Sequence, residues 1–235
     1  MAKKRRRGVR WLWRGVGLAV AGVVLIQLWF LAHVLWWIDH NPATTAYMEA
    51  RLQTLREKNP QVALRQQWVP YSRISSHLKR AVIAAEDAKF LDHEGFDWDG
   101  IQKAFEKNVK RGQIVAGGST VSQQLARNLF LSGERSWWRK AQEAAITLMI
   151  EALMGKRRIL EIYLNVVEWG DGVYGAEAAA RHYFTIPATA LSEEQAAFLA
   201  SILPRPRYYD RNRATPFIAR KMETIRARMP SAVPP

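Results

Sequence analysis

The chain has no cysteine among its 235 residues, so it forms no disulfide, binds no metal through thiolates and has no cysteine nucleophile. Alternating apolar and polar runs, which are typical of strands, are nearly missing as well, so we expect an all-α domain. Acidic residues are scarce, with 21 Asp and Glu against 35 Lys and Arg, which gives a formal charge of +14. This surplus indicates an anionic partner: nucleic acid, acidic lipid or a phosphorylated substrate.

Charged residues are also missing from one long apolar run. Neither Asp, Glu, Lys nor Arg occurs between Gly15 and Ile38, and a helix of about 20 such residues crosses a membrane. The cations before this run predict a cytoplasmic basic arm at 1–14, a transmembrane helix at 15–38 and an outward location for the rest. A cleaved signal peptide is one alternative, but the run is long for one and lacks a small-residue cleavage site. A nucleic-acid-binding arm is another, which the adjoining span argues against.

The remaining chain divides into a polar connector and one helical domain. Residues 39–61 read as a juxtamembrane connector with a helical stretch near Tyr47–Lys58, and 62–235 as the domain. A short helix is expected near Trp98–Val109, and the glycines of 92–118 predict a mobile flap. Capping signals predict five helix starts, at Ser76, at Thr120 with Gln123, at Ser136, at Ser192 with Gln195, and at Thr215 before a proline.

The first cluster of chemical interest runs from Glu86 to Gly95, where an apolar helix ends in acidic residues and is then broken by glycine. Acidic residues usually stabilise helix starts, not helix ends. A carboxylate at the end of a buried helix is therefore a candidate for a raised pKa and for proton transfer. A solvated acidic turn is the alternative interpretation.

The second cluster, 117–128, is a glycine loop that leads into a helix. Exposed amides at such a helix start bind anions, and Arg127 adds a fixed positive charge. The loop and helix also carry neutral groups of the kind that bind sugar hydroxyls, namely Ser119, Thr120, Gln123 and Gln124. A well-capped surface helix would explain Thr120 and Gln123 but not the others.

The third cluster, 135–143, combines cations with one glutamate. Arg139 and Lys140 lie four and three residues before Glu143, so all three side chains share one helix face. Taken alone, such pairs are usually solvated salt bridges worth a few tenths of a kcal/mol.

In this order the three clusters resemble the peptidoglycan glycosyltransferases of family 51, whose motifs read E-D-x-x-F-x-x-H-x-G, G-x-S-T-x-x-Q-Q, R-K-x-x-E and K-x-x-I-L-E-x-Y-L-N. Residues 156–165 match the fourth motif, 172–184 resemble a fifth block, and the resemblance covers roughly 62–226. The transpeptidase domain of bifunctional members is not found. Ser76-His77-Leu78-Lys79 fits S-x-x-K, but S-D-N and K-T-G do not follow, so a monofunctional member is expected.

The resemblance implies a lysozyme-like, two-lobed helical fold with a hydrophobic edge at the membrane. It implies that the enzyme polymerises lipid II into β-1,4-linked glycan strands with inversion and releases undecaprenyl pyrophosphate. In this reaction Glu86 would be the general base that takes the proton of the acceptor's hydroxyl. It also implies that Glu143, the second catalytic glutamate, orders the cations or holds a divalent cation, Mg²⁺ or Mn²⁺. The leaving pyrophosphate would be neutralised by Arg127, Arg135, Arg139 and Lys140. Other implied substrate-binding positions are Asp87, Phe90, His93, Ser119, Thr120, Gln123, Gln124 and Asn128.

Arg127 stands where the family usually has lysine, which keeps the charge but changes the contact geometry. The expected location is the inner membrane, as a single-pass protein with a cytoplasmic N-terminus and a periplasmic catalytic domain. Cell-division or other peptidoglycan-synthesis proteins are candidate partners, and nucleic acid is not expected. Two other functions remain open: a lysozyme-type enzyme that cleaves peptidoglycan, against which the cations argue, and an inactive scaffold, against which Glu86 and Glu143 argue.

Overall fold

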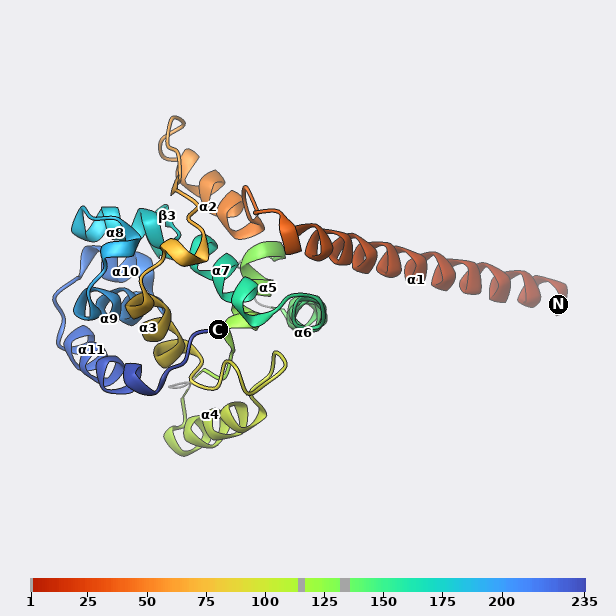
Figure 1. The fold of residues 1–235 in the computed structure, drawn as a ribbon. Coiled ribbons are helices and arrows are strands. Elements are labelled where there is room, and N and C mark those ends of the chain that lie inside the picture. The colour runs from red at the N-terminus through yellow and green to blue at the C-terminus, as the bar shows by residue number, and fades with distance from the viewer. Residues whose placement is uncertain (1, 114–116, 132–135) are drawn as a thin grey trace. The chain divides into compact units, whose positions relative to one another are not determined.

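The computed structural model describes residues 2–113, 117–131 and 136–235. The chain forms two units, Met1–His40 and Asn41–Pro235, which we describe separately (Figure 1). The first unit is one helix, α1 (Ala2–Asp39), whose segment Trp13–Asp39 has a mean hydropathy of 2.2. By length and composition this segment can cross a membrane. The helix predicted at 15–38 is therefore present.

The second unit is built almost entirely from helices, as predicted. Its α-helices are α2 (Ala46–Arg56), α3 (Ser76–Glu86), α4 (Trp98–Arg111), α5 (Val121–Phe130), α6 (Trp137–Leu153), α7 (Lys156–Val166), α8 (Ala176–Phe184), α9 (Glu193–Ile202), α10 (Pro206–Arg211) and α11 (Pro216–Arg228). Three single-turn 3₁₀ helices are η1 (Tyr71–Arg73), η2 (Ala188–Ala190) and η3 (Met229–Ser231).

A small sheet interrupts the helices, and the sequence analysis did not predict it. Its strands are β1 (Arg65–Gln66), β2 (Glu168–Gly170) and β3 (Val173–Tyr174), in the order β1-β3-β2. The first pairs with β3 in parallel, and β2 pairs with β3 in antiparallel fashion. Strands of two or three residues are too short to show an alternating pattern, so the sequence carries no readable signal for them.

Four of the five predicted helix starts are confirmed. The side chains of Thr120, Ser136, Ser192 and Thr215 each accept a backbone N–H of the helix that follows. The prediction for α3 is wrong by one residue, because Ser75 is the cap and its Oγ accepts the His77 N–H at 3.2 Å. Ser75 precedes the helix, whereas Ser76 already belongs to the first turn.

Two groups of helices make up the core of the second unit. In one, α3 packs against α9 and α11, and in the other α5 packs against α6 and α7 (Figure 1). Leu78, Ala81 and Val82 of α3 are fully buried, as their spacing predicts. The C-terminal end of α3 approaches the N-terminal end of α5, since the Val121 N–H donates to Asp87 directly after α3. This junction brings the first and second clusters together.

Candidate functional site

Glu86 is the last residue of α3, and its side chain is 13% exposed. Its Oε2 accepts a hydrogen bond from Gln124 Nε2 of α5 at 2.9 Å. Gln124 Oε1 in turn accepts the Tyr163 hydroxyl of α7 at 3.0 Å. On the other side, Lys221 Nζ of α11 lies 3.9 Å from Glu86 Oε1. Three further helices thus supply polar groups around one carboxylate.

A hollow of about 180 Å³ opens beside Glu86. Its wall includes the end of α3, the glycine loop that carries Ser119 and Thr120, and Arg228 from the end of α11. Because Gln124 occupies only Oε2, Glu86 combines a partly exposed carboxylate with space for a reacting group. This is the geometry that a general base requires.

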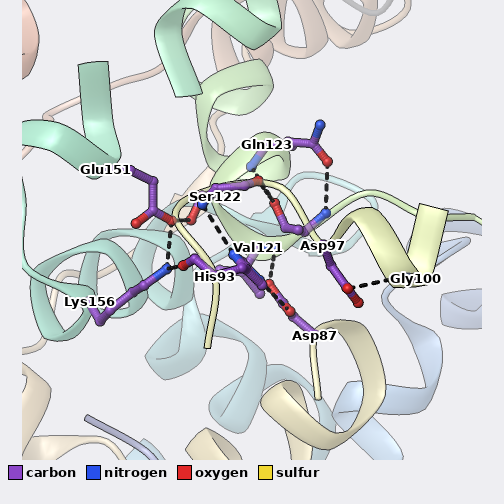
Figure 2. A network of polar contacts seen from close by, with 11 residues as sticks. Asp87, His93, Asp97, Gly100, Val121, Ser122, Gln123, Glu151 and Lys156 are labelled. Atoms are coloured by element: carbon purple, nitrogen blue, oxygen red, sulfur yellow. Dashed lines mark hydrogen bonds and ion pairs between the residues drawn. The ribbon is translucent and has the colours of Figure 1, made fainter. Parts of the chain in front are cut away.

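Asp87, the next residue, is buried and has both carboxylate oxygens in hydrogen bonds (Figure 2). Oδ1 accepts from His93 Nε2 at 2.9 Å, and Oδ2 accepts from the Val121 N–H at 2.9 Å. His93 Nδ1 accepts the Gly95 N–H at 3.1 Å, so the neutral ring carries its proton on Nε2. Burial raises the pKa of Asp87, although His93 and the Val121 N–H oppose the rise. The raised pKa expected of a carboxyl at this helix end therefore occurs at Asp87.

Thr120 and Gln123 form a reciprocal capping box at the start of α5 and are both buried. The Thr120 hydroxyl also donates to the Gly95 carbonyl oxygen at 2.7 Å. Gly95 has φ +95°, and a Cβ there would lie 2.8 Å from Thr147 Cγ2, so only glycine fits. These contacts hold the loop after α3 against α5.

Lys156, at the start of α7, ties the same loop to a third element (Figure 2). Its Nζ donates to the His93 carbonyl oxygen at 2.6 Å, pairs with Glu151 at 2.8 Å and lies 4.7 Å from the ring centroid of buried Phe90. Glu151 also accepts the hydroxyl of Ser122. The first, second and fourth motifs are therefore connected through one ammonium group.

The third cluster is an ion-pair triad on α6. Glu143 is 3% exposed, with Arg139 Nη1 3.1 Å from its Oε2 and Lys140 Nζ paired with its Oε1. The side chains of Arg139 and Lys140 are 18% and 46% exposed. A solvated salt bridge therefore does not describe this site, since the carboxylate is buried and only the cations reach solvent.

Three other predicted site residues, Ser119, Arg127 and Asn128, lie on α5 or in the loop before it. Arg127 is half-buried and has no acidic partner within 4 Å among the described residues. Asn128 is buried, and Ser119 is half-buried at the hollow. Arg135 lies outside the described residues. The roles of all the predicted site residues in substrate binding stay predictions.

Sequence reasoning assigned no role to two residues that the structure places at Glu86. Tyr163 stands at the tyrosine of the fourth motif, so the motif itself was the available signal. Lys221 lies outside the four motifs and the fifth block, and nothing in its local sequence distinguishes it from other helix-surface lysines. Burial lowers the pKa of Lys221, and the charge of Glu86 opposes that shift.

Residues 52–230 match the model of the transglycosylase family. A biosynthetic peptidoglycan transglycosylase of Methylobacillus flagellatus is 63% identical over 217 residues, which cover 92% of this chain and 95% of the relative. Proteins of the same name from Nitrosospira multiformis and Thiobacillus denitrificans are each 59% identical, covering 95% and 96% of this chain and 97% of each relative. The resemblance drawn from the motifs is confirmed, and the chain belongs to the transglycosylase family.

Proposed function

We propose that this protein is a membrane-anchored peptidoglycan glycosyltransferase that joins lipid II units into β-1,4-linked glycan strands and has no transpeptidase activity. The observation that carries the proposal is Glu86, whose carboxylate is held by Gln124 on one oxygen and borders a hollow. The names of the close relatives support peptidoglycan as the polymer.

In the proposed reaction Glu86 acts as general base. It takes the proton of the acceptor's 4-hydroxyl while that oxygen forms a bond to the anomeric carbon of the donor. The bond from this carbon to the pyrophosphate oxygen breaks, and undecaprenyl pyrophosphate leaves with the electron pair. Since a pyrophosphate is a good leaving group, no second carboxylic acid is needed to protonate it.

Cations stabilise the negative charge that develops on the departing phosphate. Arg139 and Lys140 suit this role because Glu143 holds both while their side chains keep access to solvent. Arg127 suits it because it is half-buried and has no acidic partner among the described residues. We assign Glu143 the task of positioning these cations, and Arg135 is included on its motif alone.

A bound divalent cation, Mg²⁺ or Mn²⁺, does not fit the donor set around Glu143. Both of its oxygens are paired with cations, and the described residues contain no group of three His, Cys, Asp or Glu side chains that could hold a metal ion. No step of the proposed reaction therefore passes through a metal. Polymerisation measured with EDTA and then with added Mg²⁺ or Mn²⁺ tests the family expectation directly.

We place the protein in the inner membrane, with a cytoplasmic N-terminus and a periplasmic catalytic domain. The apolar segment of α1 and the cations before it support this orientation. Exposed apolar side chains on α4 and α6 support an edge of the domain that contacts lipid, namely Trp98, Phe105, Val109, Trp137 and Trp138. Cell-division or other peptidoglycan-synthesis proteins stay candidate partners.

One assay separates the candidate functions. The detergent-solubilised protein is incubated with labelled lipid II, and the products are examined before and after muramidase digestion. A glycosyltransferase consumes lipid II and gives a muramidase-sensitive polymer. A cleaving enzyme of lysozyme type leaves lipid II intact and shortens preformed strands, and an inactive scaffold does neither.

A further inference from the structure

The hydrogen bonds at Glu86 extend one residue further into the core than the proposed reaction uses. Tyr163 is fully buried on α7, and its hydroxyl donates to Gln124 Oε1 at 3.0 Å. Gln124 Nε2 then donates to Glu86 Oε2 at 2.9 Å. The two bonds form a chain from a buried phenol, through an amide, to the proposed base.

The chain has only one consistent direction. A carboxylate only accepts hydrogen bonds, so the amide must present Nε2 to Glu86 and Oε1 to Tyr163. Tyr163 must then donate, which requires a protonated phenol. Burial, and after it the negative charge of Glu86, raises the pKa of Tyr163 well above its usual range. The phenol therefore keeps its proton and fixes the amide's orientation.

The two oxygens of Glu86 are consequently not equivalent. Oε2 is occupied by Gln124, whereas the nearest cation to Oε1 among the described residues, Lys221 Nζ, lies at 3.9 Å, beyond hydrogen-bond distance. We propose that Tyr163 is a positioning residue, which acts through Gln124 to hold Oε2 and so leaves Oε1 to accept the substrate's proton. This inference rests on the proposed function of Glu86. The O–H bond of the acceptor breaks and an Oε1–H bond forms, while the released electron pair forms the bond to the donor's anomeric carbon. The bond from that carbon to the pyrophosphate oxygen breaks, and undecaprenyl pyrophosphate leaves with its electron pair.

Several other charged groups lie near Glu86 or Tyr163 and must be kept constant in the test. They are Asp87, the next residue in the chain, Lys221 and Arg228 from α11, and Arg127, whose charge acts on Tyr163. None of them is altered by removal of the Tyr163 hydroxyl. Tyr163→Phe is therefore the defining variant, because it removes one oxygen and keeps the ring.

We expect Tyr163→Phe to lower kcat for lipid II polymerisation about five- to tenfold, the loss that one hydrogen bond represents, and to change KM less than twofold. The acidic limb of the rate–pH profile should move to higher pH, because Glu86 loses an oriented donor that favours its carboxylate form. A wild-type profile with unchanged kcat would overturn the proposal. Tyr174→Phe is the matched control, since Tyr174 is also fully buried but its hydroxyl has no partner in the described structure.

A double-mutant cycle tests whether Tyr163 acts through Gln124. Gln124→Met removes both polar atoms of the amide, so adding Tyr163→Phe to it should cost no further activity. Independent losses that multiply would contradict the inference. Should Tyr163→Phe fail to fold, the rate–pH profile is measured in Gln124→Met alone. An acidic limb at the wild-type pH would then refute the hydrogen-bond chain from Tyr163 to Glu86. Wild-type protein that does not polymerise lipid II would instead refute the proposed function.

Discussion

At the scale of single residues, Glu86 and Asp87 are adjacent carboxyl groups in different surroundings. Asp87 is buried, with both oxygens in hydrogen bonds to His93 and Val121, so it joins parts of the protein. Glu86 has one oxygen bonded and borders a hollow, so it can exchange a proton with a substrate. Adjacent acids in such different environments often divide structural and chemical work between them.

Glu86→Gln tests the chemical half of this division. We expect polymerisation to fall by about 10²–10⁴-fold, because the amide keeps the shape of the side chain but cannot accept the proton. Circular dichroism should be unchanged. Glu94→Gln, an exposed acid in the following loop, serves as control and should stay within threefold of wild type. Activity of Glu86→Gln within threefold of wild type would remove Glu86 from the mechanism.

Arg127 offers a test of charge against geometry. Loss of a preorganised contact to the leaving group costs about 10²-fold or more in rate, so Arg127→Ala should lose that much. The free energy of unfolding of Arg127→Ala should differ from that of wild type by no more than about 0.5 kcal/mol, since the side chain is not part of the apolar core. Arg127→Lys should retain most of the activity, since it restores the charge. Equal damage from both variants would mean that the planar guanidinium is required. Lys107→Ala, at an exposed position on α4, is the control.

At the scale of elements, the loop from α3 to α4 depends on one backbone conformation at Gly95. Its carbonyl accepts the Thr120 hydroxyl and its N–H binds His93, so both neighbours depend on its position. The positive φ of Gly95 and the nearby Thr147 leave no room for a side chain.

Gly95→Ala should therefore destabilise the protein by about 1–3 kcal/mol, measured by urea unfolding. Backbone strain and the close contact with Thr147 act in the same direction. Gly117→Ala is the control, because a Cβ at Gly117 meets nothing within 4 Å and its φ is not positive. Similar losses in the two variants would show that the conformation of Gly95 is not the cause.

The raised pKa of Asp87 makes the stability of the protein depend on pH. Because burial raises its pKa, the folded protein holds the proton of the Asp87 carboxyl more tightly than the unfolded chain does, where the pKa of Asp is about 3.9. The unfolded state then binds fewer protons, so this group's contribution to stability falls as pH rises from about 4 through the raised pKa.

Asp87→Asn should remove that part of the decline while lowering stability at every pH, since the amide has only one acceptor oxygen for two donors. The measurement is the free energy of unfolding against pH. A slope as steep in the variant as in wild type would assign the decline to other groups.

The sequence was most informative where periodicity and caps were strong. The helix that ends at Glu86, the caps at Thr120 and Ser192 and the apolar run in α1 were all predictable from local pattern. The partners of Asp87 were not, because Val121 contributes its backbone N–H, and a backbone donor leaves no trace in residue identity. Lys221 reaches Glu86 from another helix, which no local pattern indicates.

At the scale of the whole molecule, the chain combines a helix long and apolar enough for a membrane with a separate helical unit. An anchor would confine the enzyme to the membrane surface that holds its lipid substrate. The effective concentration of the substrate around the enzyme would then be higher than in solution.

Deletion of residues 1–38 should therefore leave a folded domain that is active in detergent but slower on lipid II in liposomes. The second unit has its own core, which supports independent folding. The full-length protein is the reference in both assays. Equal rates of the two forms on liposomes would contradict an anchoring role for α1.

The contacts that join the motifs also bear on how activity disappears during unfolding. Asp87 reaches Val121 across 34 positions of the chain, Thr120 reaches Gly95 across 25, and Lys156 reaches His93 across 63. No short stretch of sequence can assemble this site, because each contact closes a long loop whose entropic cost is recovered only when the other contacts form. Turnover should then vanish in one cooperative transition that coincides with the loss of helix signal in a urea titration. A simple rate measurement would thereby report the fraction of native molecules.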